Sequence, residues 1–179
     1  MSSIQVHDKT FVPYLSEQEI IDKVKVLAGQ LSEDYKGKRP LFISILNGSF
    51  MFSSDLFKHL TIDAEICFIK LASYKGTKSS GQVITAIGLD TDITGRDIVI
   101  LEDIIDTGKT MNQFLPQVYN QQPASLKIAV LLHKPEASIH FLKIDYTCFS
   151  IPNKFVVGYG LDYDGLGRNL PELYQLKED

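Results

Sequence analysis

The sequence contains only two cysteines, Cys67 and Cys148. They lie far apart and among apolar residues, so neither the ligand spacing of a zinc site nor a disulfide framework is present. We expect both to be buried free thiols. Internal repeats and low-complexity segments are also lacking. With 44% hydrophobic and 22% charged residues, the composition is that of a globular protein rather than a disordered or fibrous one.

Long apolar runs and an excess of positive charge are lacking as well. No run approaches the roughly 18 apolar residues of a membrane-spanning helix, and the N-terminal stretch has no basic region followed by an apolar core. We therefore expect a cytoplasmic protein with no membrane partner. Its 18 basic and 22 acidic residues give a net charge of −4, which argues against a general binder of nucleic acid. Any phosphate site must be local.

The length of 179 residues predicts a single domain that buries roughly 70% of its unfolded surface. Buried strands are predicted by short apolar runs, and helices by apolar residues at spacings of three and four. Ser16 and Glu19 form the pattern of a capping box at the start of the first helix. The expected order is a helix over 16–35, a strand over 41–46, a helix over 50–60, strands over 63–72, 82–88 and 98–101, a helix from 111 kinked at Pro116, and a strand over 125–134.

The most informative stretch follows the apolar run Ile98–Leu101, which predicts a strand buried on both faces. Glu102 and Asp103 come directly after it, and a third carboxylate, Asp106, precedes a short segment of small and hydroxylic residues. The backbone amides of that segment can hold an anion at the start of the following helix. Its members are Thr107, Gly108, Lys109 and Thr110.

Three carboxylates beside a phosphate site repel one another and the phosphate unless a cation or sugar hydroxyls lie between them. A ribose phosphate that carries a pyrophosphate and binds with magnesium would supply all of these partners. An acidic but purely structural turn is the alternative. A P-loop is excluded because Asp103 stands where its first glycine is needed, and a dinucleotide fingerprint at Gly158–Gly160 is excluded because Tyr163 stands at the third glycine position.

The stretch Glu102–Met111 resembles the phosphoribosyl-pyrophosphate binding loop of hypoxanthine-guanine phosphoribosyltransferases. A second segment, Ile151–Tyr163, strengthens the resemblance, which extends from about Leu41 onward. It implies the type I phosphoribosyltransferase fold: α/β, with a mostly parallel central sheet flanked by helices and a small hood subdomain. The core would cover about 37–145, and the hood would combine the N-terminal segment with about 146–179.

The resemblance also implies a role for each matching residue. Asp106 would be the general base, and the amides after it would bind the 5′-phosphate. Glu102 and Asp103 would contact the ribose and a magnesium ion, and Asp162 a second magnesium. Further substrate contacts would come from Asn47 and Gly48 in a pyrophosphate loop, Ser73 and Tyr74 at the start of a lid, Ile104, Ile105, Lys134, Lys154, Phe155, Val156 and Arg168. The family often has a lysine and a cis peptide in the pyrophosphate loop, and Asn47 replaces that lysine here.

Lys134 suggests the substrate class, because a lysine has three hydrogen-bond donors and no acceptor. It can bond the 6-oxo group of hypoxanthine or guanine but not the 6-amino group of adenine, and mismatches of this kind can discriminate by roughly 10⁴. The resemblance thus implies a purine salvage enzyme that forms IMP or GMP and pyrophosphate, and that assembles as a homodimer or homotetramer. A xanthine-preferring transferase, or a regulatory nucleotide- or RNA-binding protein on the same fold, are the alternatives.

Overall fold

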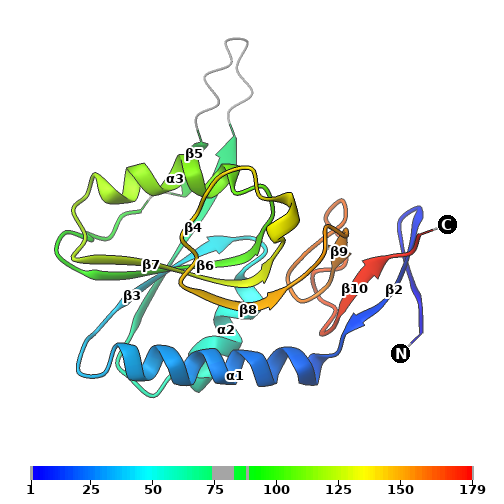
Figure 1. Cartoon of the computed structure of the whole chain (residues 1–179), viewed down its shortest axis with the longest axis horizontal. Coiled ribbons are helices and arrows are strands. Elements are labelled where there is room, and N and C mark those ends of the chain that lie inside the picture. The colour runs from blue at the N-terminus through cyan, green and yellow to red at the C-terminus, as the bar shows by residue number, and fades with distance from the viewer. Residues whose placement is uncertain (1, 74–82, 88, 179) are drawn as a thin grey trace, which may run out of the picture.

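The computed structural model describes residues 2–73, 83–87 and 89–178. Figure 1 shows the whole chain. The helices are α1 (Glu17–Asp34), α2 (Phe50–His59), α3 (Lys109–Tyr119) and the short 3₁₀ helix η1 (Pro135–Ala137). The strands are β1 (Ile4–Val6), β2 (Lys9–Leu15), β3 (Leu41–Leu46), β4 (Glu65–Ser73), β5 (Val83–Ile87), β6 (Asp97–Ile105), β7 (Ser125–His133), β8 (Tyr146–Ser150), β9 (Val156–Val157) and β10 (Leu173–Leu176).

The main sheet has six strands in the order β5-β4-β3-β6-β7-β8. All neighbours pair in parallel except β4 and β5, which are antiparallel. Parallel strands need long crossover connections, and helices supply most of them here. The carboxyl ends of the parallel strands therefore meet at one edge, which is where open α/β sheets hold their ligands. This is the mostly parallel α/β fold expected from the sequence.

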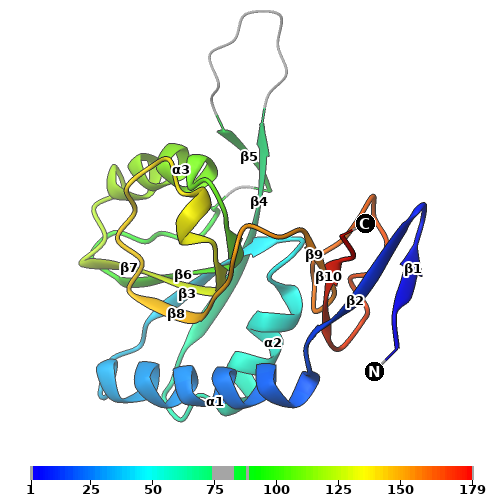
Figure 2. The same ribbon diagram turned by 45° about the vertical axis from the view of Figure 1, so that its right-hand side comes forward.

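The sheet is buried on both faces, which explains its nearly continuous apolar strands. On β3, Phe42 packs in one core cluster with residues of α1 and α2, whereas Ile43 packs in a second cluster with residues of α3. The same alternation divides Val99 and Ile100 of β6. Figures 1 and 2 accordingly show α1 and α2 on one side of the sheet and α3 on the other.

Helix α1 starts with the predicted capping box. The backbone N–H of Ser16 donates to Glu19 Oε2 at 2.9 Å, and the N–H of Glu19 donates to Ser16 Oγ at 3.3 Å. Two otherwise unpaired donors of the first turn are thus satisfied. The buried face of the helix then packs on the sheet through Ile20, Val24 and Leu31.

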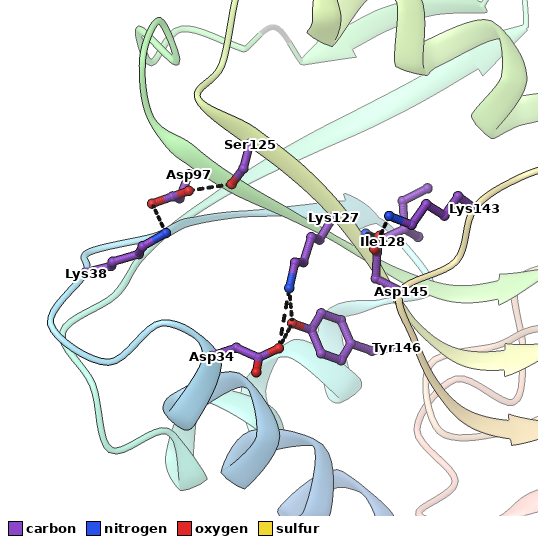
Figure 3. A network of polar contacts seen from close by, with 9 residues as sticks. All are labelled: Asp34, Lys38, Asp97, Ser125, Lys127, Ile128, Lys143, Asp145 and Tyr146. Atoms are coloured by element: carbon purple, nitrogen blue, oxygen red, sulfur yellow. Dashed lines mark hydrogen bonds and ion pairs between the residues drawn. The ribbon is translucent and has the colours of Figure 1, made fainter.

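A polar network joins the other end of α1 to the sheet (Figure 3). Lys127 of β7 donates to Tyr146 Oη of β8 at 2.9 Å and lies 3.4 Å from Asp34 Oδ2 of α1. The Tyr146 hydroxyl in turn donates to Asp34. The three side chains therefore hold the C-terminal turn of α1 against two neighbouring strands.

A second, four-stranded antiparallel sheet in the order β1-β2-β10-β9 lies at one end of the molecule, where both termini are found (Figures 1 and 2). It combines N-terminal and C-terminal segments, as expected for the hood. The predicted boundary at about residue 146 is wrong, however, because β8 pairs with β7 and is the edge strand of the main sheet. A parallel edge strand and a hood strand have the same local pattern, so only the pairing partner distinguishes them.

Two further predictions need adjustment. Strand β6 continues to Ile105, so Glu102 and Asp103 lie within the strand rather than after it. Both cysteines are free as predicted, but they are half-buried instead of fully buried. No helix in the described part of the chain is long and apolar enough to cross a membrane.

Candidate active site

The candidate site begins where β6 and β7 end side by side. Ile105 is in register with His133, and the backbone N–H of Lys134 donates to the carbonyl of Ile105 at 2.9 Å. The first residue after β6 is Asp106, whose Oδ2 accepts a hydrogen bond from Lys134 Nζ at 3.2 Å. Asp106, the predicted general base, and Lys134, the predicted contact to the purine 6-oxo group, are therefore direct neighbours. Their proximity is a consequence of the parallel register.

Lys134 is buried with only 5% of its surface exposed, whereas the Asp106 side chain is 46% exposed. A buried ammonium group is costly unless a partner compensates it, and Asp106 is that partner. The pair thus presents one confined donor group and one accessible carboxylate at the sheet edge. This is the arrangement needed to bind a polar heterocycle along one edge and to exchange a proton with it.

A cavity of about 250 Å³ opens beside this pair. Residues at the C-terminal ends of β6 and β7 form one side, and residues in and around β9 form the other. The lining residues are Asp103, Ile104, Asp106, Lys134, Phe155, Val156, Leu161 and Asp162. All except Leu161 were predicted from the sequence. The volume approaches the lower end of the range for small-molecule sites.

Phe155 and Val156 give the cavity its apolar wall. Phe155 is 45% exposed, and its ring centroid lies 5.8 Å from that of Tyr163 and 6.2 Å from that of Phe11. A large aromatic ring that stays this exposed beside a cavity leaves a face for a flat ligand. Val156 is buried in β9, whose pairing with β10 fixes its backbone position.

A smaller hollow of about 100 Å³ lies on the other side of Asp106, at the start of α3. Gly108 precedes the helix with a φ of 78°, which lets the chain turn from the strand end into the helix. The N-terminal amides of α3 face this hollow without an intrahelical partner, as in anion sites at helix starts. It is lined by Glu102, Ile104, Ile105, Asp106, Thr107, Gly108, Lys109, Thr110 and Met111. All except Met111 were predicted.

Glu102 and Asp103 are held in an environment that disfavours their charge. Burial, followed by the neighbouring charge of Asp103, raises the pKa of Glu102 well above its ordinary range. Burial also raises the pKa of Asp103 to about 6, against the opposing hydrogen bond from the Ile104 N–H. Glu102 Oε2 is buried without a hydrogen-bond partner among the described residues. Such an orphaned oxygen fits a missing cation or hydroxyl partner.

The donor chemistry of this pair suits magnesium, which prefers carboxylate and phosphate oxygens. The described residues contain no cluster of three or more His, Cys, Asp or Glu side chains that could hold a metal ion. Glu102, Asp103 and Asp162, which we predicted as magnesium ligands, therefore do not form a complete ligand set. A cation at Glu102 and Asp103 would take its remaining ligands from water and substrate.

The predicted pyrophosphate loop follows β3, and the peptide bond between Leu46 and Asn47 is cis, as the resemblance implied. Asn47 is exposed, while Gly48 is buried against Asp103. Hydrogen bonds between buried serine hydroxyls support the loop. Ser44 Oγ lies 2.7 Å from Ser49 Oγ and 2.6 Å from Ser53 Oγ. The loop is therefore anchored to both β3 and α2.

Asp162 and Arg168 lie together at the far side of the cavity. Arg168 Nη2 is 2.6 Å from Asp162 Oδ1, and Arg168 Nη1 donates to the carbonyl of Gly160 at 2.6 Å. The N–H of Gly165 donates to Asp162 Oδ2 at 2.7 Å. The planar guanidinium thus closes the turn between these residues, and it stays 29% exposed toward solvent.

One predicted substrate contact lies apart from this geometry. Lys154 pairs with Glu178 at 2.6 Å and lines neither hollow. Ser73 is the last residue of β4. Tyr74 lies outside the described residues.

The sequence also gave no indication of one supporting segment. The Ser138 hydroxyl donates to the carbonyl of Asp106 at 3.3 Å, and the N–H groups of Ile139 and His140 donate to the carbonyl of Thr107 at 3.1 and 3.3 Å. Residues 138–140 thus hold the backbone at Asp106 and Thr107, two residues that line the phosphate hollow. An irregular loop carries no periodicity, so the sequence offered no signal for it.

Comparison with known proteins decides the family. The family model described as "Phosphoribosyl transferase domain" matches residues 13–164, which is most of the chain. The chain belongs to the phosphoribosyltransferase family. Among curated phosphoribosyltransferases, the hypoxanthine-guanine enzyme of Lactococcus lactis is 48% identical over 166 residues, or 92% of this chain and 90% of the relative. The enzyme of the same name from Streptococcus mutans is 46% identical over 165 residues and covers 92% of both chains.

Solved phosphoribosyltransferase structures agree with this assignment. A hypoxanthine phosphoribosyltransferase from Staphylococcus aureus superposes with a TM-score of 0.87 at 40% identity, covering 92% of this chain and 90% of that one. A hypoxanthine-guanine phosphoribosyltransferase from Bacillus anthracis gives a TM-score of 0.86 at 38% identity, covering 91% and 96%. The fold class expected from the sequence is thereby confirmed.

Proposed function

We propose that this phosphoribosyltransferase joins a 6-oxopurine, hypoxanthine or guanine, to phosphoribosyl pyrophosphate, giving IMP or GMP and pyrophosphate. The observation that supports this most directly is the buried Lys134 paired with Asp106 between two hollows. One hollow has the aromatic wall of a base site, and the other has the amides of a phosphate site. Relatives named for hypoxanthine and guanine support the same substrate class.

The choice of purine follows from the donors at the end of β7. The ammonium of Lys134 can donate to a 6-oxo group, whereas a 6-amino group offers it another donor. The buried position makes this mismatch costly because water cannot replace the lost bond. The exposed face of Phe155 would stack on any purine and does not discriminate.

Asp106 is the proposed general base. Its accessible carboxylate would take the proton from N7 of the purine while N9 attacks the anomeric carbon. Lys134 holds that carboxylate from one side, and the Ser138 hydroxyl holds its backbone carbonyl. These contacts would fix the base between the bound purine and the phosphate hollow.

The other half of the site would stabilise the departing pyrophosphate. The partly buried guanidinium of Arg168 and the backbone of the Asn47–Gly48 loop are the groups proposed to bind it. Glu102 and Asp103 would hold the ribose hydroxyls and the magnesium ion. When bound, the ion would neutralise charge on the pyrophosphate oxygens.

The proposal includes a cytoplasmic location and a homodimeric or homotetrameric assembly, as the family resemblance implies. Nucleic acid and membranes are not among the proposed partners.

The test is to incubate the purified chain with phosphoribosyl pyrophosphate, magnesium and one of four purines: hypoxanthine, guanine, xanthine or adenine. Nucleotide formation with hypoxanthine or guanine and none with adenine is expected. A higher kcat/KM for xanthine than for hypoxanthine and guanine would identify a xanthine-preferring enzyme. Absence of product with every 6-oxopurine would contradict the proposed reaction.

A further inference from the structure

The turn Gly158–Leu161 presses directly on the pyrophosphate loop. Gly160 has a φ of +99°, and a Cβ atom placed on it would lie 2.0 Å from the carbonyl oxygen of Gly48. Real Cβ atoms essentially never come closer than 3.0 Å to another heavy atom. Only glycine therefore fits at position 160, for its backbone conformation and for the close approach to Gly48.

Gly48 is confined from its other side as well. A Cβ atom placed on Gly48 would lie 1.6 Å from Oδ2 of Asp103. The backbone of the pyrophosphate loop is thus enclosed between Gly160 and the carboxylate of Asp103. Any shift of one of these three residues must displace its neighbour, because close-packed groups have no free volume to absorb it.

A hydrogen bond provides a second connection between the same two segments. Tyr159 is buried with 1% of its surface exposed, and its hydroxyl donates to Asp55 Oδ2 at 2.7 Å. Asp55 belongs to α2, the helix that starts directly after the pyrophosphate loop. Tyr159 and Gly160 therefore fix this turn to the loop and to its helix at adjacent positions.

Gly160 is also bound to Arg168 on both of its backbone groups. Its N–H donates to the carbonyl of Arg168 at 3.0 Å, and its own carbonyl accepts from Arg168 Nη1 at 2.6 Å. The groups proposed to bind pyrophosphate and magnesium thus meet around Gly160, which is not itself among them. These groups are the Gly48 backbone, Asp103 and Arg168.

We propose that Gly160 is a positioning residue that sets the pyrophosphate side of the site. This inference rests on the proposed function. Moving Gly160 would misplace the Gly48 backbone and the Arg168 guanidinium together, while Lys134 and Phe155, the side chains proposed to bind the purine, lie outside this turn. The effect should therefore fall on the affinity for phosphoribosyl pyrophosphate and not on that for the purine.

The main test compares Gly160→Ala with Gly37→Ala. Gly37 lies in the connection between α1 and β3 with a φ of +73°, and a Cβ atom there meets no described atom within 4 Å. The control thus carries the same kind of backbone strain without the collision. In Gly160→Ala, KM for phosphoribosyl pyrophosphate and, in the reverse reaction, KM for pyrophosphate should rise between about 10-fold and 100-fold. KM for hypoxanthine should stay within about twofold of wild type, and Gly37→Ala should change all three constants by no more than about twofold.

Equal constants in the two alanine variants would overturn the inference, as would an equal rise in KM for hypoxanthine. If circular dichroism shows that Gly160→Ala does not fold, Tyr159→Phe tests the inference instead. This variant removes the hydrogen bond to Asp55 and so loosens the same turn without adding an atom. Its KM for phosphoribosyl pyrophosphate should rise about two- to fivefold at unchanged KM for hypoxanthine, and an unchanged value would overturn the inference. Wild-type enzyme runs in each assay, so failure of the proposed reaction itself would show as wild-type inactivity.

Discussion

Lys134 and Asp106 form an ion pair of 3.2 Å at the ends of two adjacent parallel strands, with the lysine buried and the carboxylate accessible. Each residue alone would be an ordinary polar group at a strand end. Together they provide a fixed donor and a neighbouring base in one cavity, and the proposed chemistry depends on that combination.

Replacing Asp106 with asparagine should remove the base but keep a hydrogen-bond acceptor near Lys134. We expect kcat to fall by about 10²- to 10⁴-fold, with the affinity for phosphoribosyl pyrophosphate nearly unchanged. Steady-state kinetics and a binding titration measure the two quantities. Asp63→Asn, at an exposed position away from the site, is the control. Near-normal turnover in Asp106→Asn would refute its role as the base.

Replacing Lys134 with methionine should remove the donor to the 6-oxo group and leave an apolar chain of similar length. The kcat/KM for hypoxanthine should drop by about 10²-fold or more, and selectivity over adenine should fall with it. Lys143→Met is the matched control, because that side chain is 85% exposed and distant from the cavity. Unaltered selectivity for hypoxanthine over adenine in Lys134→Met would mean that another group recognises the substituent at position 6 of the purine.

Replacing Asn47 with lysine should add a cation beside the bound pyrophosphate, since Asn47 is exposed in the loop next to Gly48. We expect KM for phosphoribosyl pyrophosphate to fall about three- to tenfold at low salt, and the gain to shrink as ionic strength rises. Gln121→Lys makes the same change of charge at an exposed site elsewhere. An equal effect of both variants would show that net charge, not local placement, is responsible.

The network in Figure 3 predicts a pH-dependent contribution to stability. The hydrogen bond from Tyr146, followed by the hydrogen bond and charge of Lys127, lowers the pKa of Asp34 below its ordinary value. The folded state therefore favours the ionised carboxylate, so this stabilisation is fully present above the unfolded pKa and is lost as the pH falls through the folded pKa.

Removing the Tyr146 hydroxyl in Tyr146→Phe should lower the free energy of unfolding by about 0.5–1 kcal/mol near neutral pH, because the partly exposed hydrogen bond is screened by solvent. The difference from wild type should shrink below the folded pKa of Asp34. Urea unfolding at several pH values measures it. Tyr119→Phe, at a 58% exposed position, should have no comparable effect. A difference that is constant with pH would contradict the coupling to Asp34.

Local pattern predicted the elements that build the site. The strands that end directly before Asn47, Asp106 and Lys134 were found from their apolar runs, and the capping box located the start of α1. The contacts across the chain could not be predicted, because periodicity does not specify which strands pair. The edge position of β8 and the ion pair of Lys134 with Asp106 both depend on parallel register.

The approach of Gly160 to Gly48 was missed for a related reason. The Gly158–Gly160 pattern was considered only as a nucleotide fingerprint and rejected, although two glycines one residue apart also indicate close contact with another backbone. The partner of such a contact lies far away in sequence. Only the folded structure identifies it.

The two hollows that border Asp106 are proposed to bind a 6-oxopurine and a phosphoribosyl group for transfer. The most direct measurement is the product analysis of hypoxanthine, phosphoribosyl pyrophosphate and magnesium incubated with the wild-type chain and with Asp106→Asn. We expect equal amounts of IMP and pyrophosphate from wild type, and formation slowed by orders of magnitude in the variant. Release of pyrophosphate without IMP, or equal rates in both proteins, would contradict the proposal.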